Sequence, residues 1–152
     1  MNLNAREAAV LVALGAYARQ MRLLPFAETL ETALDKVRGA LSGSAQRELL
    51  SVVDGLQFIG VPALPAPAAV RAAVEEAWFG QRPLRVRYRR ADGGAGERTV
   101  TVKGVVMERH ATLVHVVDAQ SGESRHLRLD RIDHAELVAR GEPPGGAGPG
   151  RG

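Results

Sequence analysis

The chain has 152 residues, 45% of them hydrophobic, and it contains no cysteine. This length is enough for one domain, or for a small helical unit joined to a second compact unit. The absence of cysteine excludes disulfides, thiol catalysis and cysteine-ligated zinc, and it fits a reducing cytoplasm. No apolar run in the sequence approaches the roughly 20 residues of a membrane-spanning helix. We therefore expect a cytoplasmic protein without a membrane segment.

The basic charge is concentrated towards the C-terminal part of the chain. Residues 1–62 hold six basic and six acidic side chains, whereas residues 63–140 hold thirteen basic and ten acidic ones. Eighteen of the 20 basic residues are arginine, which grips phosphate or carboxylate with two hydrogen bonds. A GC-rich genome also favours arginine codons, and composition alone does not separate the two explanations.

Residues 1–60 show the pattern of three amphipathic helices. Asn4 followed by Glu7 resembles a capping box, Pro25 ends the first helix and opens the second, and Ser44 is the expected cap of the third. Each segment carries an apolar stripe at helical spacing: Val10, Leu14, Tyr17 and Met21; Phe26, Leu30, Leu34, Val37 and Leu41; and Leu49, Leu50, Val53 and Leu56. We interpret residues 1–60 as a helical bridge or dimerisation segment, since such stripes can pack on each other, on the rest of the chain or on a second copy.

A proline-rich stretch and a fourth helix follow. Residues 60–67 (GVPALPAP) contain three prolines, which is typical of a stiff linker, and we assign residues 61–67 to it. Pro67 is expected to begin a helix that ends at Gly80. Its inward side would consist of Val70, Val74, Ala77 and Trp78.

From Pro83 onwards the hydrophobic period changes from 3.6 to 2. Residues 84–89 alternate apolar and arginine side chains, and residues 91–96 (ADGGAG) read as a hairpin loop. Further strands are expected at residues 99–107, with a bulge at Gly104, and at residues 113–118, 124–129 and 132–138. We predict an α+β chain, with a small five-stranded antiparallel barrel of the Sm or SH3 type within residues 68–140. Residues 141–152, rich in glycine and proline, are expected to be disordered.

No catalytic constellation is recognisable in the sequence. It has no nucleophile elbow and no phosphate-binding Walker loop. His115 and His126 could face one another across neighbouring strands, but no third metal ligand is obviously paired with them. We therefore expect no enzyme activity, no metal site and no cofactor.

The arginines are the candidate binding residues. Arg85, Arg87 and Arg89 must point the same way from their strand, because strand side chains alternate. Without interleaved acids they repel each other unless an anion or nearby carboxylates sit among them. The other interpretation is a solvated edge strand, whose charge blocks aggregation.

Residues 124–132 (SRHLRLDRI) closely resemble the arginine-rich signature that ends the WYL domain of bacterial transcriptional regulators. Residues 72–88 (AAVEEAWFGQRPLRVRY) look like that family's entry helix and first strand. Residues 5–41 are similar to the helical bridge that joins the family's DNA-binding head to the WYL domain. The sequence departs from the family where its naming tripeptide is expected, at Thr112-Leu113-Val114, and Val102 replaces a usual proline. No winged helix-turn-helix precedes Met1, so we expect either a fragment of a regulator or a stand-alone WYL protein.

The resemblance implies a non-enzymatic sensor whose basic groove binds a nucleic acid or nucleotide, and a homodimer that works with a separate or missing helix-turn-helix module. Arg125, Arg128 and Arg131 match the signature arginines, and His126 shares the polar side of Arg128. Leu127 and Leu129 should point inwards, and Asp130 should orient an arginine. The predicted ligand-binding set is thus Arg85, Arg87, Arg89, Arg125, His126, Arg128 and Arg131, on one groove. The alternative is an interaction or dimerisation module whose ligand pocket has degenerated.

Overall fold

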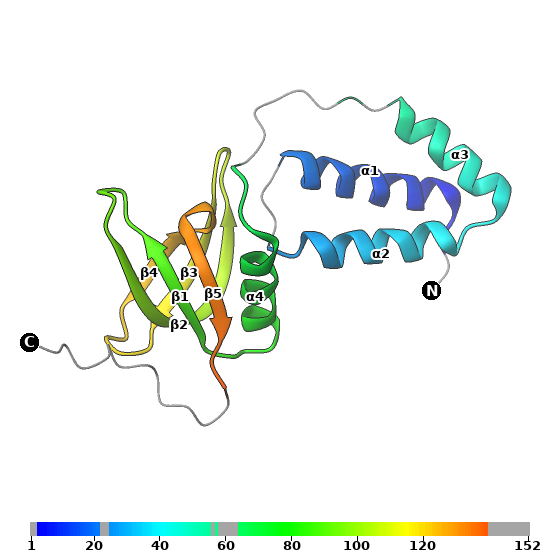
Figure 1. Ribbon diagram of the computed structural model, residues 1–152. Helices are drawn as coiled ribbons and strands as arrows, with labels where there is room; N and C mark the ends of the chain where they lie inside the picture. Colours follow the sequence, from blue (N-terminus) through cyan, green and yellow to red (C-terminus); the bar gives the residue numbers. More distant parts are fainter. Residues whose placement is uncertain (1–2, 22–24, 56, 58–63, 140–152) are drawn as a thin grey trace, which may run out of the picture.

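The computed structural model describes residues 3–21, 25–55, 57 and 64–139. Four helices precede five strands (Figure 1): α1 (Ala5–Met21), α2 (Ala27–Gly39), α3 (Gly43–Asp54), α4 (Ala68–Phe79), β1 (Leu84–Arg89), β2 (Ala95–Met107), β3 (Thr112–Asp118), β4 (Ser124–Arg128) and β5 (Ile132–Leu137). A single 3₁₀ turn, η1 (Leu129–Arg131), joins β4 to β5. The α+β prediction is confirmed. The expected linker at residues 61–67 lies partly, and the expected tail at residues 141–152 wholly, outside the described residues.

The first three helices begin much as the sequence indicates. The backbone N–H of Glu7 donates to Asn4 Oδ1 at 2.8 Å, and the N–H of Asn4 donates to Glu7 Oε1 at 3.1 Å, which completes the capping box. The predicted cap of the third helix was wrong by two residues. Ser42, and not Ser44, accepts the N–H of Ala45 at 3.3 Å, because α3 already begins at Gly43.

The helical unit has a small core formed by one side of each helix. Its buried members are Ala9, Val12, Leu34 and Leu49, with Leu30, Val37 and Leu41 packed against them. A Cβ atom on Gly15 would lie 2.5 Å from Leu34 Cδ1, so α1 and α2 approach closely at this glycine. The predicted stripe of α1 is instead the side facing solvent, since the inward side is made of alanine, valine and glycine.

All neighbouring strands of the sheet are antiparallel, in the order β4-β3-β2-β1-β5. The register of β2 against β3 shifts between Val102 and Gly104, which confirms the bulge expected at Gly104. The predicted barrel is corrected: β4 and β5 are the two edges of an open sheet, and no ladder joins them. The chain passes from β4 to β5 through η1, where Leu129 is completely buried. Side-chain packing therefore fills the space between these two edge strands, which no backbone hydrogen bonds join.

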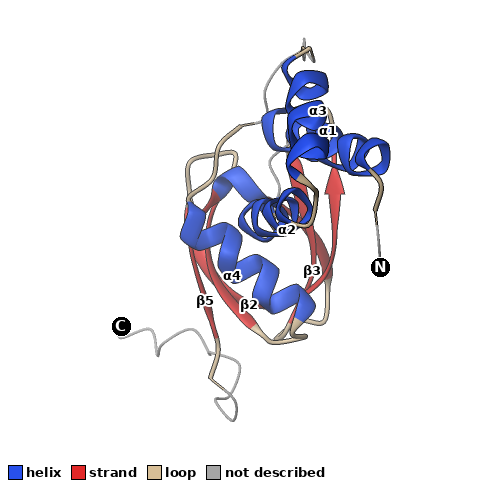
Figure 2. Cartoon of the chain, turned by 90° about the vertical axis from the view of Figure 1, so that its right-hand side faces the viewer, coloured by secondary structure: helices blue, strands red, loops and turns tan. Residues whose placement is uncertain are grey.

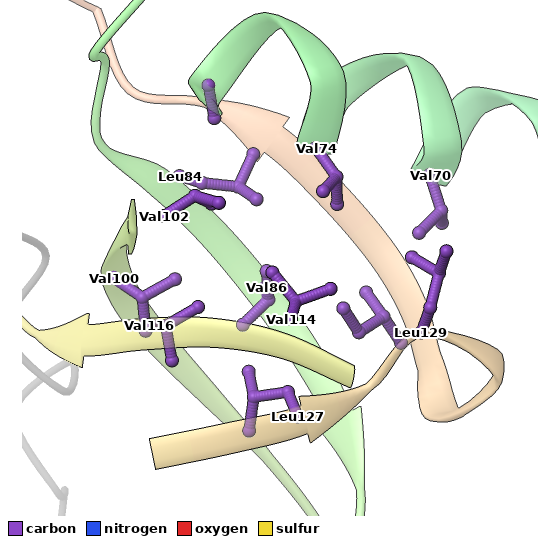
Figure 3. Close-up of a cluster of buried hydrophobic side chains, with 12 residues drawn as sticks. Val70, Val74, Leu84, Val86, Val100, Val102, Val114, Val116, Leu127 and Leu129 are labelled. Atoms are coloured by element: carbon purple, nitrogen blue, oxygen red, sulfur yellow. The ribbon is translucent and has the colours of Figure 1, made fainter. Parts of the chain in front are cut away.

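The main core lies between the sheet and α4. Figure 2 shows α4 crossing one face of the sheet, and Figure 3 shows Val70 and Val74 pointing from this helix towards strand side chains. The buried cluster comprises Val70, Val74, Ala77, Leu84, Val86, Val100, Val102, Val114, Val116, Leu127, Leu129 and Ile132. Trp78 packs against this cluster and contacts Phe26, with ring centroids 6.4 Å apart. An ion pair of 2.8 Å between Arg71 and Glu28 also joins α4 to α2. None of the described helices is long and apolar enough to cross a membrane.

Candidate anion-binding site

The strand pairings divide the arginines between two faces of the sheet. We call the face towards α4 the inner face and the opposite one the outer face. Leu84 and Val86 are buried on the inner face, whereas Arg85, Arg87 and Arg89 alternate with them and lie on the outer face. The prediction that these three arginines share one side of β1 is confirmed.

Carboxylates from β5 accompany the arginines of β1. Arg85 Nη1 lies 3.1 Å from Glu136 Oε1, and Arg89 Nε lies 3.2 Å from Asp133 Oδ1. Arg89 also donates from Nη2 to the carbonyl of Asp130 at 3.1 Å. Arg87 has no ion pair among the described residues, although Glu97 and His134 lie opposite it on the neighbouring strands. The carboxylates of Glu136 and Asp133 therefore relieve much of the repulsion between the three arginines that the sequence suggested.

The signature segment folds as the resemblance implies. Leu127 and Leu129 are buried in the main core. Arg128 donates from Nε and Nη2 to the two carboxylate oxygens of Asp130, both at 3.2 Å. Asp130 therefore orients an arginine, as expected. Arg131 forms no ion pair within the described part of the chain.

A cavity of about 580 Å³ opens where β4 approaches the hairpin of β1 and β2. We call it the seam cavity, and it is lined by Tyr88, Arg90, Gly96, Glu97, Arg98, Arg125, His126 and Leu127. Of the seven predicted binding residues, only Arg125 and His126 line it. The pairings place Arg125 on the inner face, opposite Val116, so the structure does not bring the predicted set into one groove.

Arg90 and Arg98 are cavity residues that the sequence analysis missed. The predicted second strand began at Thr99, but β2 begins four residues earlier, at Ala95. Extending the alternation back from Val102 and Val100 would have placed Arg98 on the inner face. The signal was therefore present in the pattern, and only the strand boundary concealed it.

Arg98 is held by a buried carboxylate. Its Nη1 lies 2.9 Å from Oδ2 of Asp118, whose side chain is 6% exposed. Asp118 Oδ1 accepts the backbone N–H groups of Gln120 at 2.8 Å and of Ser121 at 3.2 Å. These two N–H groups, together with the Arg98 guanidinium, hold the pKa of Asp118 below its usual value. Asp118 is therefore the ionised anchor that fixes Arg98 at the cavity wall.

Arg125 lines the seam cavity from β4, and Tyr88 lines it from the β1–β2 hairpin. Arg125 Nη2 lies 2.8 Å from Glu123 Oε2, while its buried Nε has no hydrogen-bond partner among the described residues. The Tyr88 hydroxyl accepts the backbone N–H of Arg128 at 3.3 Å. This hydrogen bond links β1 to β4, which do not pair in the sheet. It therefore holds the two sides of the seam together.

The two histidines singled out in the sequence do face each other. His115 and His126 lie opposite in the pairing of β3 with β4, and their rings stack with centroids 4.9 Å apart. Ser124 Oγ lies 3.4 Å from His115 Nε2. Among the described residues, no group of three or more potential ligands surrounds them.

Comparison with known families decides the identity of the second half. The family model described as the WYL domain matches residues 69–137. Residues 69–137 form a WYL domain. It comprises nearly all of α4 and the whole sheet. The search of curated proteins found no match.

A solved structure resembles the chain as well. It is proteasome accessory factor B/C (PafBC) of Arthrobacter aurescens, with 19% sequence identity and a TM-score of 0.44. The similarity covers 92% of this chain and 21% of that one. The chain thus spans about a fifth of the length of PafBC. WYL domains are regulatory, ligand-sensing modules, and this chain carries one.

Proposed function

We propose that the WYL domain senses an anionic effector, a single-stranded nucleic acid or a nucleotide, for a transcription regulator. The observation that supports this is the seam cavity, on which Arg90, Arg98 and Arg125 converge from the β1–β2 hairpin, β2 and β4. The proposal assigns no catalytic step and no cofactor to the chain. It requires a DNA-binding module, in the same protein or in a partner, and a cytoplasmic location follows because a regulator acts at the chromosome.

The ion pairs of these arginines leave them able to bind an anion. A guanidinium has five N–H donors, and Arg98 and Arg125 each use one of them in the ion pairs described above. The Arg125–Glu123 pair is partly exposed on both sides and contributes only about 0–1 kcal/mol, whereas Arg98 stays paired with the buried Asp118. A phosphate can therefore accept two parallel hydrogen bonds from the N–H donors that the ion pairs do not use.

Arg125→Ala should weaken the binding of a labelled single-stranded oligonucleotide and lower its salt dependence. Each neutralised phosphate on a single strand adds roughly −0.7 to the log–log salt slope, so losing one contact should reduce the slope by about that amount. The measurement is fluorescence anisotropy with a ten-residue oligothymidine between 50 and 200 mM salt, a range chosen for this titration. Because stacking and phosphate contacts do not depend on sequence, the loss should be the same for other base compositions.

Two further variants locate the effector. Arg38→Ala, in the charge-balanced helical unit, is the matched control and should leave both affinity and slope unchanged. Arg87→Ala tests the outer face, which also carries the predicted residues Arg85, Arg89 and Arg128. If Arg87→Ala weakens binding and Arg125→Ala does not, the effector lies on the outer face. If Arg125→Ala, Arg87→Ala and Arg38→Ala all bind the oligonucleotide as the wild type does, the arginines form a solvated surface and the proposal fails.

An exposed apolar strip on α1 favours a second candidate function, self-association. Val10 is 53% exposed, Leu11 45% and Leu14 61%, and these side chains lie on one side of the helix. Exposed apolar clusters of this kind mark interaction surfaces more often than isolated side chains do. We propose that the helical unit forms a homodimer through this strip, with or without a functional seam cavity.

Leu14→Glu should convert a dimer into a monomer. A charge at the centre of an apolar interface loses its hydration without gaining a partner. Light scattering at micromolar protein concentration measures the mass directly. Leu64→Glu, at a side chain that is 45% exposed outside the helical unit, should leave the mass unchanged. A wild-type protein that is already monomeric at these concentrations contradicts this second function.

A further inference from the structure

We infer that the seam cavity receives a single nucleotide with a phosphate monoester, its ring over Gly96 and against Tyr88, and its phosphate at Arg98 and Arg125. The occupant is either a free nucleoside monophosphate or the phosphorylated end of a strand. This inference rests on the proposed function, and it specifies which anion the cavity selects.

The space for a ring is next to Gly96. Gly96 lies directly opposite Tyr88 in the pairing of β1 with β2, so the two residues are on the same face. Tyr88 lines the cavity as well; the other ring there, that of His126, is stacked on His115. In many sheets an aromatic side chain folds over a glycine in this position and fills the space. Here a Cβ atom built on Gly96 would meet Arg90 Nη1 at 3.9 Å and nothing else within 4 Å. The Tyr88 ring therefore leaves the space over Gly96 open.

Tyr88 is a fixed platform for this ring. Its hydroxyl is held by the backbone N–H of Arg128, and its side chain packs against the main core. Binding to an aromatic ring that is already fixed loses less conformational entropy than binding to a mobile one. Stacking of a base on an aromatic side chain changes affinity by roughly tenfold to a hundredfold. Tyr88 thus supplies an aromatic surface, which Thr112-Leu113-Val114, at the position of the family's naming tripeptide, lacks.

The two arginines favour a terminal phosphate over an internal one. Arg98 is anchored from β2 by Asp118, and Arg125 comes from β4 on the other side of β3. A phosphate monoester carries up to two negative charges and three free oxygens at neutral pH, whereas a diester within a strand carries one charge. Cavities that hold single small ligands have volumes of about 300–1,000 Å³, and the seam cavity, at about 580 Å³, falls in that range.

Gly96→Val fills the proposed ring space without altering any charge. Gly96 does not have a left-handed φ, so its backbone tolerates a side chain, and valine favours a strand more than glycine does. We expect the affinity for AMP to fall at least tenfold, while the thermal midpoint stays the same or rises. A merely destabilising substitution would lower the midpoint. Gly104→Val, on the same strand with nothing within 4 Å of its Cβ position and outside the cavity, is the matched control and should bind AMP normally.

Calorimetry with AMP, adenosine and inorganic phosphate tests the two halves of the site. AMP should bind more tightly than either adenosine or phosphate, and Tyr88→Leu should lose roughly tenfold or more of the AMP affinity. Ten-residue oligothymidines with a 5′-phosphate, a 3′-phosphate or no phosphate then distinguish the source. If a phosphorylated oligonucleotide displaces AMP and the unphosphorylated one does not, the occupant is a strand end. If AMP binds more tightly than any of the oligonucleotides, the occupant is the free nucleotide.

The failures of the two proposals differ. If oligonucleotides bind with no preference for a terminal phosphate and Gly96→Val binds as the wild type does, while Arg125→Ala weakens binding, this inference is wrong and the proposed function stands. If AMP, adenosine, phosphate and all the oligonucleotides fail to bind at 50 mM salt, a condition chosen to strengthen phosphate contacts, both are wrong.

Discussion

Replacing Leu129 with alanine is expected to lower the free energy of unfolding by about 3 kcal/mol, within the roughly 2–5 kcal/mol typical of buried leucines. Leu129 is completely buried in the main core, in the turn between the two edge strands. The truncation removes apolar contacts and leaves a cavity that the closely packed surroundings fill only in part. Urea unfolding followed by the fluorescence of Trp78, which packs against the same cluster, measures the change.

Leu50→Ala is the matched control for this experiment. The Leu50 side chain is 57% exposed on α3, so the same chemical truncation should cost less than about 1 kcal/mol. Equal losses in the two variants would contradict the central place of Leu129 in the core.

The second large effect is expected at Asp118. At pH 7, Asp118→Ala should lower the free energy of unfolding by about 3 kcal/mol, because it removes a buried carboxylate that accepts two backbone N–H groups and pairs with Arg98. An exposed carboxylate gives the comparison: Asp35→Ala, which removes the ion pair to Arg38, should cost less than about 1 kcal/mol.

The cost of losing Asp118 should depend on pH. The pKa of Asp118 is held below its usual value in the folded chain, so folding favours the ionised carboxylate. Its contribution is therefore fully present above the unfolded pKa of about 3.9 and is lost as the pH falls through the lower folded pKa. Urea midpoints measured at pH 7 and at successively lower pH should show the difference between wild type and Asp118→Ala shrinking in acid. A difference that stays constant would show that the carboxylate acts through packing and not through its charge.

Local patterns predicted the elements of this fold well. The change of period at Pro83 separates the helices from the sheet, and Gly104 marks a bulge where the register of β2 shifts. The capping box at Asn4 and the inward direction of Leu127 and Leu129 are also confirmed. All of these depend on residues within a few positions of one another in the sequence, where helix and strand periodicity decides the side-chain direction.

Boundaries and helix faces were predicted less well. The stripe of Val10 and Leu14 has the right spacing for a core, but α1 packs through its smaller residues, with Gly15 close to Leu34. Both sides of this helix are apolar, so periodicity could not select between them. A strand begun four residues too late concealed Arg98.

The sequence by itself determined the order and type of the elements, the WYL resemblance and the shared side of Arg85, Arg87 and Arg89 on β1. Only the tertiary structure decided which arginines meet. Alternation orients Arg85 and Arg125 within their own strands, but strand order and curvature place the first beside Glu136 on the outer face and the second in the seam cavity. The barrel expectation failed for the same reason. Closure depends on pairing between β4 and β5, and such long-range pairing is set by packing against α4 and η1, which no local pattern encodes.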